Sequence, residues 1–178
     1  MFKGTYPYKI DPKGRLPVPA AFRRALAEQG ASTVVVTLLD QCLAVYPLAE
    51  WQRLEGQLRA LPAFSKQVKA LTRWLTSRVA DCDMDVQGRI LLPPSLRQAV
   101  GLERDAIIVG VLDRFEVWAP DGWDSFLRES EKLLDDVSFD LQWPLPVAPA
   151  ATAPPAPPAT SPSEAAAPER HPQAKPKR

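Results

Sequence analysis

The sequence is poor in the residues that most often perform catalysis or bind metals. It contains one histidine, His171, and two cysteines, Cys42 and Cys82, which lack metal-ligand spacing. There is no nucleophile elbow, P-loop, zinc signature or glycine-rich dinucleotide loop. These absences argue against an enzyme, a small-molecule substrate and a cofactor. We expect both cysteines to be free thiols in a reducing cytoplasm.

Long hydrophobic runs and a strong charge imbalance are absent too. The sequence has no apolar segment of roughly 18 residues, and its N-terminus lacks a signal-peptide hydrophobic region. We therefore expect neither a membrane span nor secretion. A net charge of +1 does not by itself predict a nucleic-acid partner. The hydrophobic fraction of 46% is sufficient for a packed core.

A duplicated motif is the most informative feature of the chain. Residues 11–23 read D-P-K-G-R-L-P-V-P-A-A-F-R, and residues 85–97 read D-V-Q-G-R-I-L-L-P-P-S-L-R. The residues that recur in register are Asp11/Asp85, Gly14/Gly88, Arg15/Arg89, Pro19/Pro93 and Arg23/Arg97. The sequel is similar, since 39–46 aligns with 112–118 when Leu39 is matched to Leu112 and one residue is dropped. The pattern indicates two copies of one module.

The two copies differ in charge. Residues 9–26 carry five cations and one acid, a net charge of +4, whereas residues 83–100 carry two of each. The cations of the first copy are Lys9, Lys13, Arg15, Arg23 and Arg24.

Each copy is predicted to have the order β-β-α-β-β. Asp-Pro-x-Gly at 11–14 matches a type I turn, so we expect a ribbon of two strands on either side of it. Pro19 suits the first position of a helix over 20–28, and Gly30 ends that helix. Residues 32–39 favour a strand buried on both faces, followed by a turn at Asp40-Gln41 and a strand at 42–46. The second copy repeats this order over 79–118.

Helices are expected after each module. Pro47 begins one with an apolar stripe, Pro62 interrupts it, and 63–78 forms another whose basic face is interpreted as solvated. Pro120 begins a final helix. The apolar positions expected on the first and last of these are Leu48, Trp51, Leu54, Leu58 and Leu61, and Trp123, Phe126, Leu127, Leu133 and Leu134. Four tryptophans are interpreted as packing residues: Trp51, Trp74, Trp118 and Trp123. Residues 144–178 are rich in proline and alanine, which predicts a disordered tail with polyproline II character.

These features together resemble the bacterial MraZ family of the SpoVT/AbrB-like superfamily. The resemblance rests on the opening Met1-Phe2-Lys3-Gly4 and the two Asp-x-x-Gly-Arg motifs with their downstream Pro and Arg, and it covers about residues 1–143. It implies an α+β fold of two tandem swapped-hairpin modules that pair within one chain. The expected parts are 1–62, a connecting helix at 63–78, 79–143 and the tail 144–178. The long tail and Gln87 at the position of Lys13 depart from the pattern.

The resemblance also implies a function. Such a protein would be a nucleoid-associated transcriptional regulator that binds direct repeats in double-stranded DNA upstream of its own division and cell-wall gene cluster. It would assemble into a ring-like homo-oligomer. The alternative is an oligomeric protein-interaction module of the AbrB/antitoxin type, which would need an exposed apolar segment.

The repeated turns supply the candidate DNA-binding residues, because a two-stranded ribbon fits the major groove. Arginine can bind phosphate or guanine through two hydrogen bonds, and glutamine can pair with adenine. The candidate donors are Lys13, Arg15, Gln87 and Arg89, of which both arginines are expected to be exposed. Arg23 and Arg97 complete the candidate DNA-binding set; each either contacts phosphate or anchors its helix to the module.

Asp11, Gly14, Asp85 and Gly88 are interpreted as turn-forming residues. Each aspartate either accepts backbone N–H groups or orients the arginine four residues on, which would keep it ionised.

Overall fold

Each copy of the repeat folds as β-β-α-β-β in the computed structural model, which describes residues 1–135. The first copy comprises β1 (Thr5–Lys9), β2 (Arg15–Pro17), α1 (Ala20–Glu28), β3 (Thr33–Leu39) and β4 (Cys42–Pro47). The second comprises β5 (Val79–Asp83), β6 (Arg89–Leu91), α4 (Pro94–Ala99), β7 (Asp105–Val111) and β8 (Arg114–Trp118). The remaining helices are α2 (Leu48–Ala60), α3 (Lys66–Thr76) and α5 (Pro120–Asp135). The α+β class and the predicted order of elements are confirmed, and the tail 144–178 lies outside the described residues.

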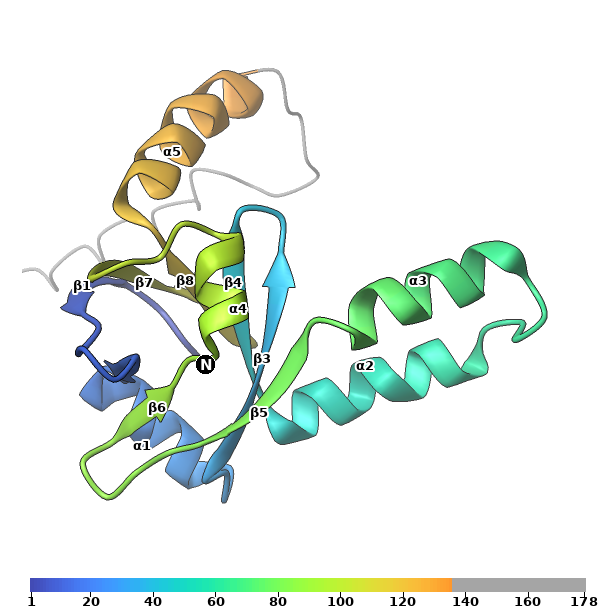
Figure 1. Ribbon diagram of the computed structural model, residues 1–178, viewed down its shortest axis with the longest axis horizontal. Helices are drawn as coiled ribbons and strands as arrows, with labels where there is room; N and C mark the ends of the chain where they lie inside the picture. Colours follow the sequence, from blue (N-terminus) through green and yellow to red (C-terminus); the bar gives the residue numbers. More distant parts are fainter. Residues whose placement is uncertain (136–178) are drawn as a thin grey trace, which may run out of the picture. The chain divides into compact units, whose positions relative to one another are not determined.

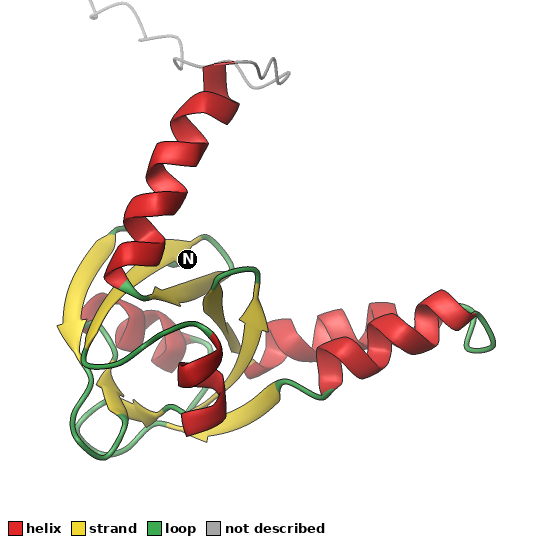
Figure 2. Cartoon of the chain, turned by 45° about the horizontal axis from the view of Figure 1, so that its top comes forward, coloured by secondary structure: helices red, strands yellow, loops and turns green. Residues whose placement is uncertain are grey.

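The strands form one antiparallel sheet in the order β1-β7-β8-β4-β3-β5 and a two-stranded sheet of β2 and β6 (Figures 1 and 2). β1 of the first copy pairs with β7 of the second, and β5 of the second pairs with β3 of the first. Equivalent residues face each other at the middle of both sheets, Ala44 opposite Glu116 and Leu16 opposite Ile90. An approximate twofold axis therefore relates the two copies.

The two-stranded ribbon is built differently from the sequence prediction. The strands on either side of each repeated turn do not form a ladder with each other; β1 joins the large sheet, and β2 pairs with β6. The expectation that each copy forms its own ribbon was therefore wrong. A lone short hairpin is marginally stable in water, and pairing β2 with β6 allows Leu16 and Ile90 to be buried together.

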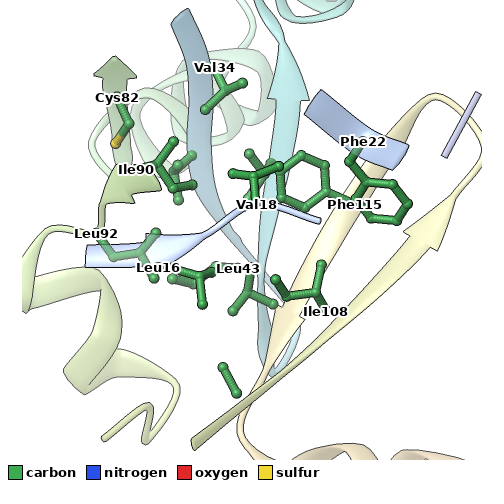
Figure 3. Packing of buried hydrophobic residues seen from close by; sticks show 14 of the residues in the cluster. Leu16, Val18, Phe22, Val34, Leu43, Cys82, Ile90, Leu92, Ile108 and Phe115 are labelled. Carbon is green, nitrogen blue, oxygen red and sulfur yellow. The ribbon is translucent and has the colours of Figure 1, made fainter. Parts of the chain in front are cut away.

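The hydrophobic core draws on both copies (Figure 3). Leu16 and Leu43 of the first copy are fully buried with Ile90, Ile108 and Phe115 of the second. Since each copy supplies strands to the other's side of the sheet, neither copy encloses a core with its own residues. A segment as short as one copy would bury too little surface to be stable alone.

Several details depart from the expected boundaries. Pro19 caps α1 rather than opening it, and Pro93 does the same for α4. The helix expected at 63–78 is shorter, because the Ser65 hydroxyl accepts a hydrogen bond from the backbone N–H of Val68 and begins α3 there. In the β7–β8 hairpin, Leu112 has a φ of 62° and corresponds to Asp40, whose φ is 49°. The alignment of Leu39 with Leu112 was therefore off by one residue.

The predicted packing role holds for part of the apolar set. Trp51 and Trp118 are buried, and the ring of Trp123 packs on that of Trp118 at 5.7 Å between centroids. Trp74 is 44% exposed with the Arg78 guanidinium 5.1 Å from its ring centroid, so its assignment to the core was wrong. The apolar positions that are also exposed are Leu48, Leu61, Phe126, Leu127 and Leu133.

Among residues 1–135, no helix is long and apolar enough to cross a bilayer.

Candidate nucleic-acid interface

The two Asp-x-x-Gly-Arg motifs form the same tight turn. The Gly14 N–H donates to the Asp11 carbonyl oxygen at 2.8 Å, and Gly88 donates to that of Asp85 at 2.8 Å. Both glycines have positive φ, 86° and 75°. These are the features of a three-residue hairpin loop whose last position needs a left-handed residue, which explains glycine there.

Each aspartate performs both of the roles considered from the sequence. Asp11 Oδ1 accepts the backbone N–H groups of Lys13 and Arg15 at 2.9 and 3.0 Å, while its Oδ2 accepts Arg15 Nε at 2.6 Å. Asp85 Oδ1 accepts the N–H groups of Gln87 and Arg89 at 2.9 and 3.0 Å, while its Oδ2 accepts Arg89 Nε at 2.8 Å. The carboxylate thus closes the turn and orients the arginine.

These contacts lower the pKa of both carboxyl groups. For Asp11 the largest cause is the backbone hydrogen bond from Arg15, and for Asp85 it is the side-chain hydrogen bond from Arg89. A carboxylate that accepts several hydrogen bonds is favoured in its charged form. Both aspartates are therefore ionised at neutral pH.

The two turns lie side by side. Arg89 Nη1 is 3.9 Å from Asp11 Oδ2 of the other copy, in addition to its own pairing with Asp85. Arg15 pairs with Asp11, and no such contact to Asp85 is present in the described residues. The first turn's carboxylate is therefore shared by two guanidinium groups, which makes the arrangement asymmetric.

The ribbon of β2 and β6 presents these arginines on its outer face. Leu16 and Ile90 point into the core, so their neighbours Arg15, Arg89 and Leu91 lie on the opposite side. The Arg15 and Arg89 side chains are 33% and 21% exposed. The expectation that both arginines would be exposed was wrong: they are partly buried, because each aspartate holds its arginine against the turn.

The tips of the turns carry the most exposed candidates. Lys13 and Gln87 are both exposed, as are their neighbours Pro12 and Val86. A hollow of about 630 Å³ beside the first turn carries three cations and two carboxylates, and it is lined by Lys9, Ile10, Asp11, Pro12, Arg97, Glu103 and Arg104. Sequence reasoning missed Arg104, because only the folded chain brings it beside the first turn. It also missed Leu91, an exposed apolar residue within the second motif.

The guanidinium groups of Arg23 and Arg97 each lie beside the turn of the opposite copy, at Gly88 and Gly14, but within residues 1–135 only Arg23 makes a hydrogen bond to that copy. Arg23 on α1 donates from Nη1 to the Gln87 carbonyl oxygen at 3.1 Å, and Arg97 on α4 donates from Nε to the Leu92 carbonyl oxygen at 3.3 Å. Of the two alternatives considered, these contacts fit anchoring. In the sequence, the equal spacing of glycine and arginine in both copies indicated that these arginines have a shared role. It did not indicate which of the two turns each arginine contacts.

Comparison with known proteins gives matches to one family. The family model described as "MraZ protein, putative antitoxin-like" matches residues 1–74 and 77–139. A relative from Desulfitobacterium hafniense strain DCB-2, named transcriptional regulator MraZ, is 47% identical over 131 residues, which are 74% of this chain and 90% of the relative. A relative of the same name from Ligilactobacillus salivarius is 44% identical over 138 residues, 78% of this chain and 94% of the relative. The chain therefore belongs to the MraZ family.

Proposed function

We propose that this protein is a sequence-specific transcriptional regulator that binds double-stranded DNA through the paired turns at 11–15 and 85–89. The observation that carries the proposal is the placement of two turns of the same conformation side by side, with exposed tips and with arginines oriented by carboxylates. The names of its relatives, which are transcriptional regulators, support the same function.

The proposed contacts follow from the chemistry of each group. Lys13 at the first tip suits a phosphate, whereas Gln87 at the second tip can hydrogen-bond a base edge. Arg15 and Arg89 offer guanidinium groups that are already oriented, so less conformational entropy is lost when they bind. Asp11, Gly14, Asp85 and Gly88 shape the turns and do not contact DNA.

We assign residues 1–62 and 79–143 to two modules of the swapped-hairpin class, joined by the segment 63–78. The pairing of β1 with β7 and of β5 with β3 supports this assignment, since the first strand of each copy is exchanged. The proposed site of action is the nucleoid, on direct repeats upstream of the protein's own division and cell-wall gene cluster. A ring-like homo-oligomer would present several such turn pairs to successive repeats.

Footprinting on the DNA upstream of the protein's own gene tests this function. We expect evenly spaced protected repeats, and loss of protection for a variant with Lys13→Ala and Gln87→Ala, whose exposed side chains make no contribution to the core. A matched control is Gln57→Ala on the exposed face of α2. Uniform protection, or none, would contradict sequence-specific binding.

A protein-interaction function of the antitoxin type has support from a separate surface. Phe64, just before α3, and Trp74, on α3, are 93% and 44% exposed, and each lies close to a cation. Aromatic residues and arginine are enriched at protein interfaces. Pull-down of a defined partner by wild-type protein, lost with Phe64→Ser and Trp74→Ser while DNA binding is kept, would support this second function.

A further inference from the structure

The arginines downstream of each repeated turn form a reciprocal clamp between the two copies. Arg23 of the first copy lies on Gly88 of the second turn, where a Cβ atom on residue 88 would overlap the guanidinium. Arg97 of the second copy lies on Gly14 of the first turn, with Nη2 3.0 Å from the position that a Cβ would occupy. Each glycine is thus needed both for its positive φ and for the space that the opposite arginine fills.

The backbone reinforces this exchange. The Val18 N–H donates to the Gly88 carbonyl oxygen at 2.9 Å, and the Leu92 N–H donates to the Gly14 carbonyl oxygen at 3.0 Å. Each turn is therefore held by a strand and a helix of the other copy. Among the described residues, the one side-chain hydrogen bond from the opposite copy to a turn tip is that from Arg23 to the Gln87 carbonyl oxygen.

We propose that Arg23 and Arg97 are positioning residues that fix the spacing of the two turn tips, so that Lys13 and Gln87 engage one DNA site together. This inference rests on the proposed DNA-binding function. Neither arginine needs to touch DNA for this role: an arginine fork restricts the opposite turn, and a restricted turn loses less entropy on binding.

The clamp makes a crossed prediction that a local role does not make. Arg23→Ala should increase backbone hydrogen exchange in the turn at 85–89, and Arg97→Ala should increase it in the turn at 11–15. A merely structural residue would instead loosen its own helix or the whole fold. Exchange measured by mass spectrometry on the full chain without DNA tests this, with Arg24→Ala on the same helix as the matched control, because Arg24 is exposed.

DNA binding separates positioning from phosphate contact. Arg23→Lys keeps the charge but loses the planar fork and its hydrogen bond to the Gln87 carbonyl oxygen, so we expect operator affinity to fall about tenfold, as for one lost hydrogen bond to a charged group. Toward the opposite turn, Arg97→Lys loses only the packing on Gly14 and should lower operator affinity by less. In Arg23→Ala and Arg97→Ala the slope of log affinity against log salt should stay unchanged, whereas a lost phosphate contact would reduce it by roughly 0.9. Affinity would be measured by fluorescence anisotropy from low to physiological salt.

Three results would overturn the clamp. If hydrogen exchange rises in the turn of the same copy as the substituted arginine, or in neither turn, the arginines do not restrict the opposite turn. A salt slope that falls by roughly 0.9 in the alanine variants would make these arginines direct phosphate ligands. If wild-type protein binds no duplex while the exchange pattern is crossed, the DNA-binding function fails and the positioning role fails with it.

Discussion

At the scale of single residues, the arginines of the two turns are not equivalent. Arg89 reaches both aspartates, whereas Arg15 pairs with Asp11. Arg89→Ala would leave two carboxylates near each other with one guanidinium, since Arg15 remains. We expect it to lower the free energy of unfolding by about 1 kcal/mol and Arg15→Ala to lower it by less, because partly exposed ion pairs are weak. Urea unfolding of both variants, with Arg24→Ala as control, measures this, and equal losses would contradict the shared carboxylate.

The same pair should also differ on DNA. The first copy has a surplus of positive charge near its turn and the second does not. Arg15→Ala should weaken binding to operator and random DNA alike and reduce the salt slope by roughly 0.9. Arg89→Ala should weaken operator binding more than random binding, by about 1–3 kcal/mol if a paired base contact is lost. Anisotropy titrations on both duplexes decide this, and equal effects of the two substitutions would refute the division of roles.

The aspartates predict a pH dependence of stability. The pKa of Asp11 and of Asp85 is lowered in the folded chain, so below the unfolded value of about 3.9 the unfolded state binds more protons. The stability contributed by these carboxylates is thus present above about pH 4 and is lost as the pH falls through the lower folded pKa. Thermal unfolding between pH 7 and 3 should show a smaller acid loss for the variant with Asp11→Asn and Asp85→Asn. An acid loss identical to wild type would exclude this contribution.

At the scale of elements, two glycines provide a matched test of close packing. Gly110 of β7 lies against the backbone of Phe2 and Lys3, where an added Cβ would overlap the Lys3 nitrogen, whereas Gly56 in α2 has open space around it. Gly110→Ala should lower the free energy of unfolding by roughly 1–3 kcal/mol, because backbone cannot move aside as a flexible side chain does. Gly56→Ala should raise it by about 0.5–1 kcal/mol through helix propensity. Chemical unfolding of both variants measures these effects, and a neutral Gly110→Ala would show that the N-terminal segment shifts freely.

At the scale of the whole molecule, the core of residues 1–135 is built from the two copies. The buried hydrophobic residues of the described chain lie between Phe2 and Trp118. A chain that ends at Trp143 should therefore unfold cooperatively with the midpoint of the full chain, and should keep its oligomeric state and most of its DNA affinity. Calorimetry, light scattering and anisotropy on the two lengths measure this. Loss of the cooperative transition would show that residues 144–178 contribute to the fold.

The proposed assembly predicts how affinity grows with the number of DNA repeats. If one oligomer presents several turn pairs, the second contact is intramolecular and benefits from a raised effective concentration. Duplexes with two or three repeats in phase should bind far more tightly than a duplex with one, whereas repeats moved by half a helical turn should lose that gain. Equal affinity for every duplex would contradict the proposal that one oligomer binds several repeats at once.

The sequence by itself determined the local structure and the family. The turn at Asp11–Gly14 can be predicted because aspartate, proline and glycine each stand at a turn position that the residue favours. The recurrence of the motif at 85–97 identifies the repeat. Core strands such as 33–39 follow from their apolar, β-branched composition, since this pattern is read within a few residues. The helix boundaries were within a few residues for the same reason.

Only the tertiary structure decided which copy each strand and side chain meets. The two copies have nearly the same pattern, so local reasoning cannot distinguish pairing of β2 with its own hairpin partner from pairing with β6. Burial decides which strand pairs with β2, because Leu16 and Ile90 are buried against each other only when β2 and β6 pair across the twofold axis. The same exchange places Arg23 on Gly88 and Arg97 on Gly14, and leaves Trp74 exposed on α3. These contacts join residues more than sixty positions apart, and their energies depend on surfaces that exist only when both copies are folded together.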